Sequence, residues 1–270
     1  MAGKQKKPVQ TVTKPFITGG ITDENTIRNA LKFFGTILLV TVMTFIVCMM
    51  THFDQAVLRA IANLAVAALV LFIMFSKGTD KGAEAVTRGE ILYQRREKGA
   101  EMTEAERRLS YHPLKGYLNG LLGTLPLLIP AVVLALIAKR QMTSIGALPS
   151  WMGTMTRRSE IGDALVTYTQ PEPMSFEEYL RVFVRACVMP YINMAGSENK
   201  NLLLTVERFS PILLLLPCAA FGTGYTQGRK IRSRVHTSIA ESNRIRKRRE
   251  NKARKARRNA GQSRGPEQLN

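Results

Sequence analysis

Apolar residues are concentrated in four long blocks, and polar residues fill the segments between them. The blocks are roughly Leu31–Met50, Ala56–Phe75, Tyr117–Ala138 and Leu203–Tyr225. About 20 mainly apolar residues in a helix cross the hydrocarbon core of a bilayer. Only helices and closed barrels satisfy their backbone hydrogen bonds in lipid, and the blocks lack the alternation of barrel strands. The pattern predicts an all-α, polytopic membrane protein with four transmembrane helices.

The blocks divide the chain into three parts. Residues 1–30 form a polar N-terminal segment, residues 31–225 the four-helix transmembrane domain, and residues 226–270 a basic tail. Within the domain, connector 76–116 follows the second span and connector 139–202 follows the third. A soluble protein of this length would spread its charge over many amphipathic elements instead.

The distribution of basic residues predicts the topology. Six Lys/Arg lie in the first 32 residues, nine in 76–116 and fifteen in the tail, whereas 51–55 has none and the long 139–202 has seven. The positive-inside rule therefore places both termini and connector 76–116 in the cytoplasm. An even number of spans agrees with this assignment. We expect the protein to be integral to the plasma membrane.

Connector 76–116 carries two helix signals. Residues Ala83–Lys98 favour a helix, supported by Glu84 and Arg88 at the i,i+4 spacing. Thr103 followed by Glu106 is a capping-box pattern that predicts a second, short helix. Nine basic and seven acidic residues nearly cancel, so the connector is interpreted as a solvated helical hairpin at the membrane face, with a partner-docking surface as the alternative.

Connector 139–202 contains a stronger helix signal. Ser175 and Glu178 form a capping-box pattern ahead of a helix over Phe176–Met189, which Pro190 is expected to end. The apolar residues of this helix share one broad face: Phe176, Tyr179, Leu180, Phe183 and Cys187. We expect an amphipathic helix in the outer membrane interface or across the mouth of the bundle, or alternatively a compact ectodomain cap.

Prolines interrupt the last two spans. Pro126 and Pro130 lie in the third span, and Pro211 and Pro217 in the fourth. A proline inside a helix removes a backbone hydrogen bond and crowds a carbonyl, so both spans are predicted to kink. Kinked helices line substrate paths in transporters, but Gly and Pro are also common packing features of membrane helices. Because no ionisable residue lies at the centre of a span, the packing interpretation is favoured.

The tail is dominated by basic residues. Residues 229–258 hold fourteen Lys/Arg against Glu241 and Glu250. Helix formers are common from about residue 227 to 258, and Ile231, Val235, Ile239 and Ile245 form a thin apolar stripe. The candidate binding residues are Arg229, Lys230, Arg232, Arg234, Arg244, Arg246, Lys247, Arg248, Arg249, Lys252, Arg254, Lys255, Arg257 and Arg258.

Three partners suit such a tail. A basic amphipathic helix is typical of binding to anionic lipid head groups or to an acidic protein. RNA, for example a ribosome, is the third option, because phosphate neutralisation needs only Lys and Arg. The tail lacks the aromatic residues that stack on bases, so RNA is the less favoured partner.

Candidate catalytic chemistry is sparse. Cys48, Cys187 and Cys218 show no CxxC or Cys/His spacing, so neither a disulfide framework nor a metal site is predicted. Glu207 and Arg208, at the start of the fourth span, are interpreted either as an interfacial pair or as the mark of a hydrocarbon-embedded helix that begins at Phe209. Together with connector 139–202 they are the only candidates for an embedded enzyme, and they form no motif. We predict no catalytic residues, no cofactor and no metal.

These observations favour a non-enzymatic membrane scaffold or assembly component. Its docking elements would be connector 76–116 and the tail, and its partner another membrane protein or a second copy of the chain in a homo-oligomer. One alternative is a subunit of a small-solute transporter or channel, lined by the kinked spans. The other is a membrane tether for RNA or ribosomes.

Overall fold

The computed structural model describes residues 13–50, 53, 55–139, 175–196 and 199–262, and every regular element within these ranges is a helix. Four of the helices are long and apolar enough to cross a membrane, as predicted. These are α1 (Thr26–Met50), α2 (Ala56–Glu97), α4 (Lys115–Ile137) and α9 (Lys200–Gln262). The shorter helices are α3 (Glu104–Arg108), α7 (Phe176–Cys187) and α8 (Met189–Ala195).

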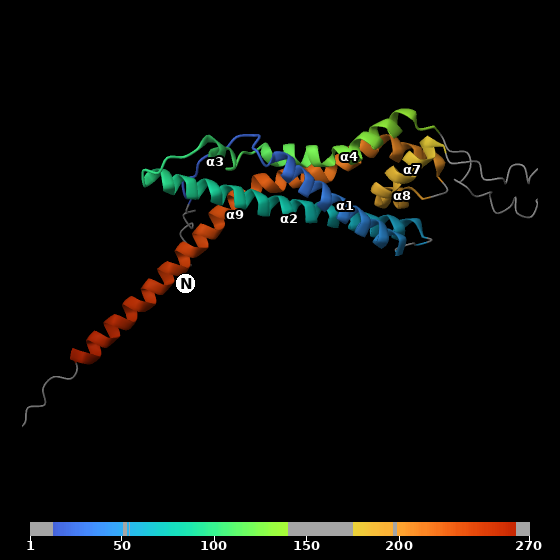
Figure 1. Ribbon diagram of the computed structural model, residues 1–270. Helices are drawn as coiled ribbons and strands as arrows, with labels where there is room; N and C mark the ends of the chain where they lie inside the picture. Colours follow the sequence, from blue (N-terminus) through green and yellow to red (C-terminus); the bar gives the residue numbers. More distant parts are fainter. Residues whose placement is uncertain (1–12, 51–52, 54, 140–174, 197–198, 263–270) are drawn as a thin grey trace, which may run out of the picture.

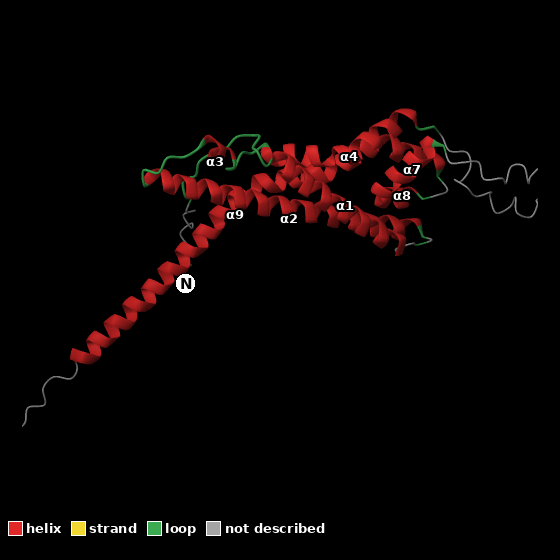
Figure 2. Ribbon diagram, in the orientation of Figure 1, coloured by secondary structure: helices red, strands yellow, loops and turns green. Residues whose placement is uncertain are grey.

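The long helices form an elongated bundle (Figures 1 and 2). Helix α9 packs against α2 and α4, and α4 also packs against α1. The start of α1, the helix α3 and the last part of α9 lie at one end of the bundle, called the terminal end below. Helices α7 and α8 lie at the opposite end, called the loop end.

The interior is apolar, and so is much of the outside. Phe33, Met74, Leu134 and Phe221 are among the buried core residues, and the rings of Phe33 and Phe221 meet edge to face at 4.8 Å. Large apolar side chains also cover the outer faces, such as Leu136, which is 81% exposed. Water-soluble monomers rarely expose such extended apolar surface. These faces fit a hydrocarbon environment.

Helix α2 does not end where its apolar block ends. It continues to Glu97, so the helix predicted over Ala83–Lys98 is its last part rather than a separate element. Glycines weaken an isolated helix, but Gly78 and Gly82 are buried here, and their lack of a side chain lets α9 approach closely. The capping box predicted for α3 is present, with the Glu106 amide donating to Thr103 Oγ1 at 3.3 Å.

The predicted end of the helix over Phe176–Met189 is wrong by a few residues. Helix α7 ends at Cys187, and Pro190 lies in the first turn of α8 instead of ending α7. A proline is well accommodated in a first turn, where its missing N–H has no helical partner. The capping box at Ser175 and Glu178 is present as predicted.

Helix α7 packs on the bundle with only part of its predicted apolar face, through Leu180 and Cys187. Arg181 and Val184 are its buried residues, whereas Phe176 and Tyr179 are 72% and 61% exposed. The apolar residues at 176, 179 and 183 therefore face away from the bundle. Burial of Arg181 has a specific cause, described below.

Candidate functional site

Helices α2 and α9 leave the apolar part of the bundle together, in contact through glycines. Gly78 and Gly82 of α2 lie against the backbone of Phe221 and Tyr225 of α9, where any side chain would overlap a carbonyl oxygen. Gly224 and Gly228 of α9 lie in the same way against the backbone of α2. Each pair is spaced by four residues, the small-residue pattern that permits close helix approach in lipid. This spacing is visible in the sequence and is the signal that indicates the contact.

A buried ionic cluster joins the same two helices. It follows the glycine contacts along both helices and lies further from the apolar core. The Glu90 carboxylate of α2 accepts two hydrogen bonds from Arg232 at 3.1 Å and lies 2.7 Å from His236 Nε2. The side chains of Glu90 and His236 are only 7% and 6% exposed. Arg232, predicted to bind lipid or a partner, is therefore occupied by an internal contact.

The N-terminal segment crosses this junction. The amide of Ile17 donates to the Gly89 carbonyl at 3.2 Å, and the amide of Gly19 donates to the Tyr111 carbonyl at 2.9 Å. Phe16 packs edge-on against the Tyr111 ring, and Arg229 lies over the Phe16 ring at 5.4 Å. Arg229, another predicted binding residue, thus contacts the protein itself. Burial raises the pKa of the Tyr111 hydroxyl above its ordinary value, partly offset by Arg229.

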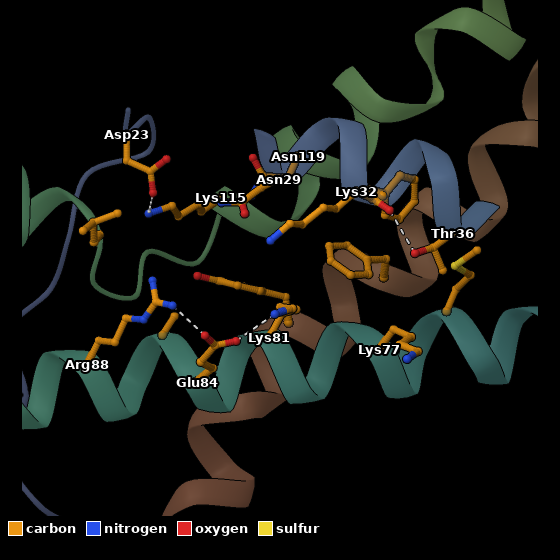
Figure 3. Close-up of a pocket in the computed structure, with 16 residues that line it drawn as sticks. Asp23, Asn29, Lys32, Thr36, Lys77, Lys81, Glu84, Arg88, Lys115 and Asn119 are labelled. Atoms are coloured by element: carbon orange, nitrogen blue, oxygen red, sulfur yellow. Dashed lines mark hydrogen bonds and ion pairs between the residues drawn. The ribbon is translucent and has the colours of Figure 1, made fainter. Parts of the chain in front are cut away.

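A cavity of about 190 Å³ opens at the terminal end between α1, α2, α4 and α9 (Figure 3). Five cationic side chains line it, against the carboxylates of Asp23 and Glu84. The cations are Lys32, Lys77, Lys81, Arg88 and Lys115. No part of the sequence analysis assigned these residues to a site, because they are dispersed over three segments of the chain.

Both carboxylates of the cavity are occupied by neighbouring cations. Lys115 Nζ lies 2.5 Å from Asp23 Oδ2, with both side chains at most 4% exposed, and it also donates to the Arg108 carbonyl at 2.8 Å. Glu84 accepts a hydrogen bond from Arg88 at 2.6 Å, as the i,i+4 spacing predicts, and a second one from Lys81 at 2.8 Å. The hydrogen bond from Lys81, assisted by the charges of Lys81 and Arg88, lowers the pKa of Glu84 and keeps it anionic.

The rest of the tail lies apart from the bundle. Every residue from 241 to 257 is exposed, and nine Lys/Arg lie in that segment with Glu241 and Glu250. Arg246 and Glu250 form an exposed pair at 3.0 Å. The predicted apolar stripe is exposed too, with Ile239 at 53% and Ile245 at 52%. The predicted binding residue Arg258 lies in the last turns of α9, and residues 263–270 lie outside the described ranges.

The predicted kink residues are internal to long helices. Pro126 and Pro130 lie within α4, and Pro211 and Pro217 within α9, and both helices continue through them. Thr124 donates to the Gly120 carbonyl at 2.7 Å in the buried part of α4. Kinking at these positions stays a prediction.

A second buried ionic cluster lies at the loop end and explains the orientation of α7. Glu207 of α9 is 1% exposed and accepts hydrogen bonds from Arg181 at 3.2 Å and from Arg185 at 2.7 Å. Arg181 also donates to Glu177 and to the Lys139 carbonyl, each at 2.8 Å. The predicted pair of Glu207 with Arg208 is therefore wrong, since Glu207 binds cations of α7. Consecutive helix residues point in different directions, so they rarely pair with each other.

In the described part of the chain, no group of three or more His, Cys, Asp or Glu residues is placed to hold a metal ion. No disulfide bond joins the three cysteines, and burial raises the pKa of Cys187 on α7 to about 11. The chain matches no known protein family, no curated protein and no solved structure.

Proposed function

We propose that this protein is a scaffold or assembly component of the plasma membrane, non-enzymatic and with both termini in the cytoplasm, whose basic tail engages anionic groups. The continuity of α9 carries the proposal. A single helix joins a candidate membrane span to a segment, residues 241–257, in which every side chain is exposed and cations outnumber anions. A helix anchored in this way holds its charge at a fixed place relative to the membrane.

The length of α9 suggests two kinds of contact. Its 63 residues extend about 95 Å at 1.5 Å per residue, and its last turns continue obliquely away from the bundle (Figure 1). Attraction to lipid head groups is screened within about 8 Å at physiological salt. Exposed cations close to the bundle, such as Lys230 and Arg234, are proposed to contact anionic head groups. The cations beyond residue 240 are proposed to contact an acidic partner protein.

Affinity purification from membranes in a mild detergent tests this function. The full chain should recover a membrane-associated protein in stoichiometric amount. Replacing the nine Lys/Arg of residues 241–257 by Gln should abolish that recovery. This variant is sharper than removal of the whole tail, because Arg232 and His236 are left in place to hold α9 against Glu90.

A matched control uses the same segment without changing its charge. Ser242, Asn243 and Asn251 are exposed polar residues of the segment, and replacing all three by Ala should leave recovery unchanged. A partner retained by the Gln variant, or no partner with the unaltered chain, contradicts the proposal. A partner lost on nuclease treatment would assign the tail to RNA instead.

A further inference from the structure

We propose that the cavity at the terminal end binds a phosphate group carried by a ligand that enters between α1 and α2. The proposal concerns a site separate from the tail and does not depend on the tail having a partner. It rests on three features of the cavity: an excess of cations, an unsatisfied buried amide and a location where the apolar parts of the helices end.

The excess of positive charge is concentrated on two lysines. Asp23 is occupied by Lys115, and Glu84 is shared by Lys81 and Arg88. Lys32 and Lys77 also line the cavity, and neither forms an ion pair with any described residue. Figure 3 shows Lys32 of α1 and Lys81 of α2 extending toward the space between the two helices.

Ammonium groups that line a common cavity repel one another, and the exposed side chains of Lys32 and Lys77 are accessible to a ligand. An anion in the cavity would remove that cost. A role as topology signals alone would require these lysines only to lie near the membrane surface. It would not require them to line the same cavity. A phosphate fits the donor set, because Lys ammonium groups bind phosphate as point charges and Arg88 adds a planar donor.

The buried amide indicates a second group on the ligand. Asn119 of α4 lines the cavity and is 7% exposed, yet its side-chain oxygen accepts no hydrogen bond from any described residue. A buried acceptor without a donor costs about 1–3 kcal/mol. A hydroxyl next to the phosphate, or a water bound with it, would supply that donor.

The cavity lies where the apolar parts of the helices meet their charged parts. Its apolar wall includes Phe33, Met74 and Phe221 of the bundle core, and its charged wall includes Lys115 and Asp23 beyond the apolar part of α4. One water needs roughly 10–15 Å³ of such space, so about 190 Å³ accommodates a phosphate with an attached polar group. Basic pockets between membrane helices bind anionic lipid head groups in this manner. A soluble phosphate compound offers the same chemistry.

Titration of the delipidated full-length protein in detergent tests the site. Binding is measured by native mass spectrometry with three probes. Dioctanoyl phosphatidylglycerol carries a phosphate and hydroxyls, and dioctanoyl phosphatidylcholine has a zwitterionic head group. The third probe is inorganic phosphate. The phosphatidylglycerol is expected to bind. The double variant Lys32→Gln/Lys77→Gln should weaken its binding by about tenfold or more, since each juxtamembrane cation contributes on the order of 1 kcal/mol.

The matched control removes the same charge outside the cavity. Arg96 and Lys98 are exposed residues at the end of α2 and do not line the cavity, and Arg96→Gln/Lys98→Gln should change the affinity less than twofold. Binding of phosphatidylglycerol that inorganic phosphate cannot displace assigns the site to lipid. Displacement by inorganic phosphate assigns it to a soluble phosphate compound.

Three results would overturn the site. The first is no binding of phosphatidylglycerol or of inorganic phosphate. The second is an affinity for zwitterionic phosphatidylcholine equal to that for phosphatidylglycerol, and the third is an equal loss of affinity in the two double variants. The variant with nine Gln in residues 241–257 should retain the binding. Failure of the cavity and failure of the tail proposal are therefore distinguishable, because each variant affects one readout only.

Discussion

The two parts of α9 use charge in opposite ways. In the first part, Glu207 is 1% exposed and held by two arginines, and further along Arg232 and His236 enclose Glu90. In the second part, residues 241–257 are all exposed, and Glu250 only forms a surface pair with Arg246. The comparison separates charges that hold the fold together from charges that remain available to a partner.

This difference changes the interpretation of the tail. A count of basic residues treats all fourteen as equivalent. Within the structure, however, Arg232 forms an ion pair with Glu90, and Arg229 lies over the ring of Phe16. Removing a buried partner leaves an uncompensated charge in a low dielectric, whereas an exposed charge returns to water at little cost. Substitutions in the first part should therefore affect stability, and those in the second part binding.

The largest effect is expected at Glu207. Replacing Glu207 by Ala leaves Arg181 and Arg185 without their shared carboxylate, which should lower the free energy of unfolding by about 3–5 kcal/mol. Glu250→Ala on the same helix is the matched control, since an exposed pair contributes about 0–1 kcal/mol. Unfolding in detergent, followed by circular dichroism, measures both variants. Equal losses would mean that burial does not distinguish the two carboxylates.

A smaller effect is expected at the contact of α9 with α2. Gly82→Ala places a methyl group against the Tyr225 carbonyl, and the helices must separate at a cost of about 1–3 kcal/mol. Gly35→Ala on α1 is the control, because nothing lies within 4 Å of an added methyl group there, and helix propensity favours Ala. Thermal unfolding should show a lower midpoint for Gly82→Ala only. A midpoint unchanged at Gly82 would contradict the close helix contact.

The smallest effect on stability is expected in the second part of α9. The variant with Gln at all nine basic positions of residues 241–257 should change the free energy of unfolding by less than Gly82→Ala does, because each surface substitution shifts it by only about 0.5 kcal/mol in either direction and the repulsion among neighbouring cations is removed at the same time. The measurement is the same unfolding experiment in detergent. A loss as large as that of Glu207→Ala would mean that this segment packs on the bundle.

The sequence predicts those elements whose signals are local. The four apolar blocks give the spans, and the pairs Thr103/Glu106 and Ser175/Glu178 give two helix starts, because a capping box involves residues three apart. The continuation of α2 to Glu97 is not predicted, because glycine lowers helix propensity. Gly78 and Gly82 stabilise this part of α2 only through the close contact with α9, which the local sequence does not encode.

The candidate sites require contacts that composition does not encode. Glu207 meets Arg181 and Arg185 across 26 and 22 positions of the chain, and Glu90 meets Arg232 across 142. The apolar positions of α7 indicate an amphipathic helix, but they do not indicate that Arg181 faces the bundle to meet the carboxylate of Glu207 on α9. Likewise, Lys32 and Lys77 share a cavity only because α1 and α2 run side by side there.

Labelling of introduced cysteines tests the membrane topology on which the scaffold and the cavity both depend. In a background with Cys48, Cys187 and Cys218 replaced by Ala, Tyr179→Cys would lie at the loop end and Ser242→Cys in the exposed part of α9. A membrane-impermeant maleimide should label Tyr179→Cys in intact cells, and Ser242→Cys only after the membrane is permeabilised. Labelling of Ser242→Cys in intact cells would contradict the account.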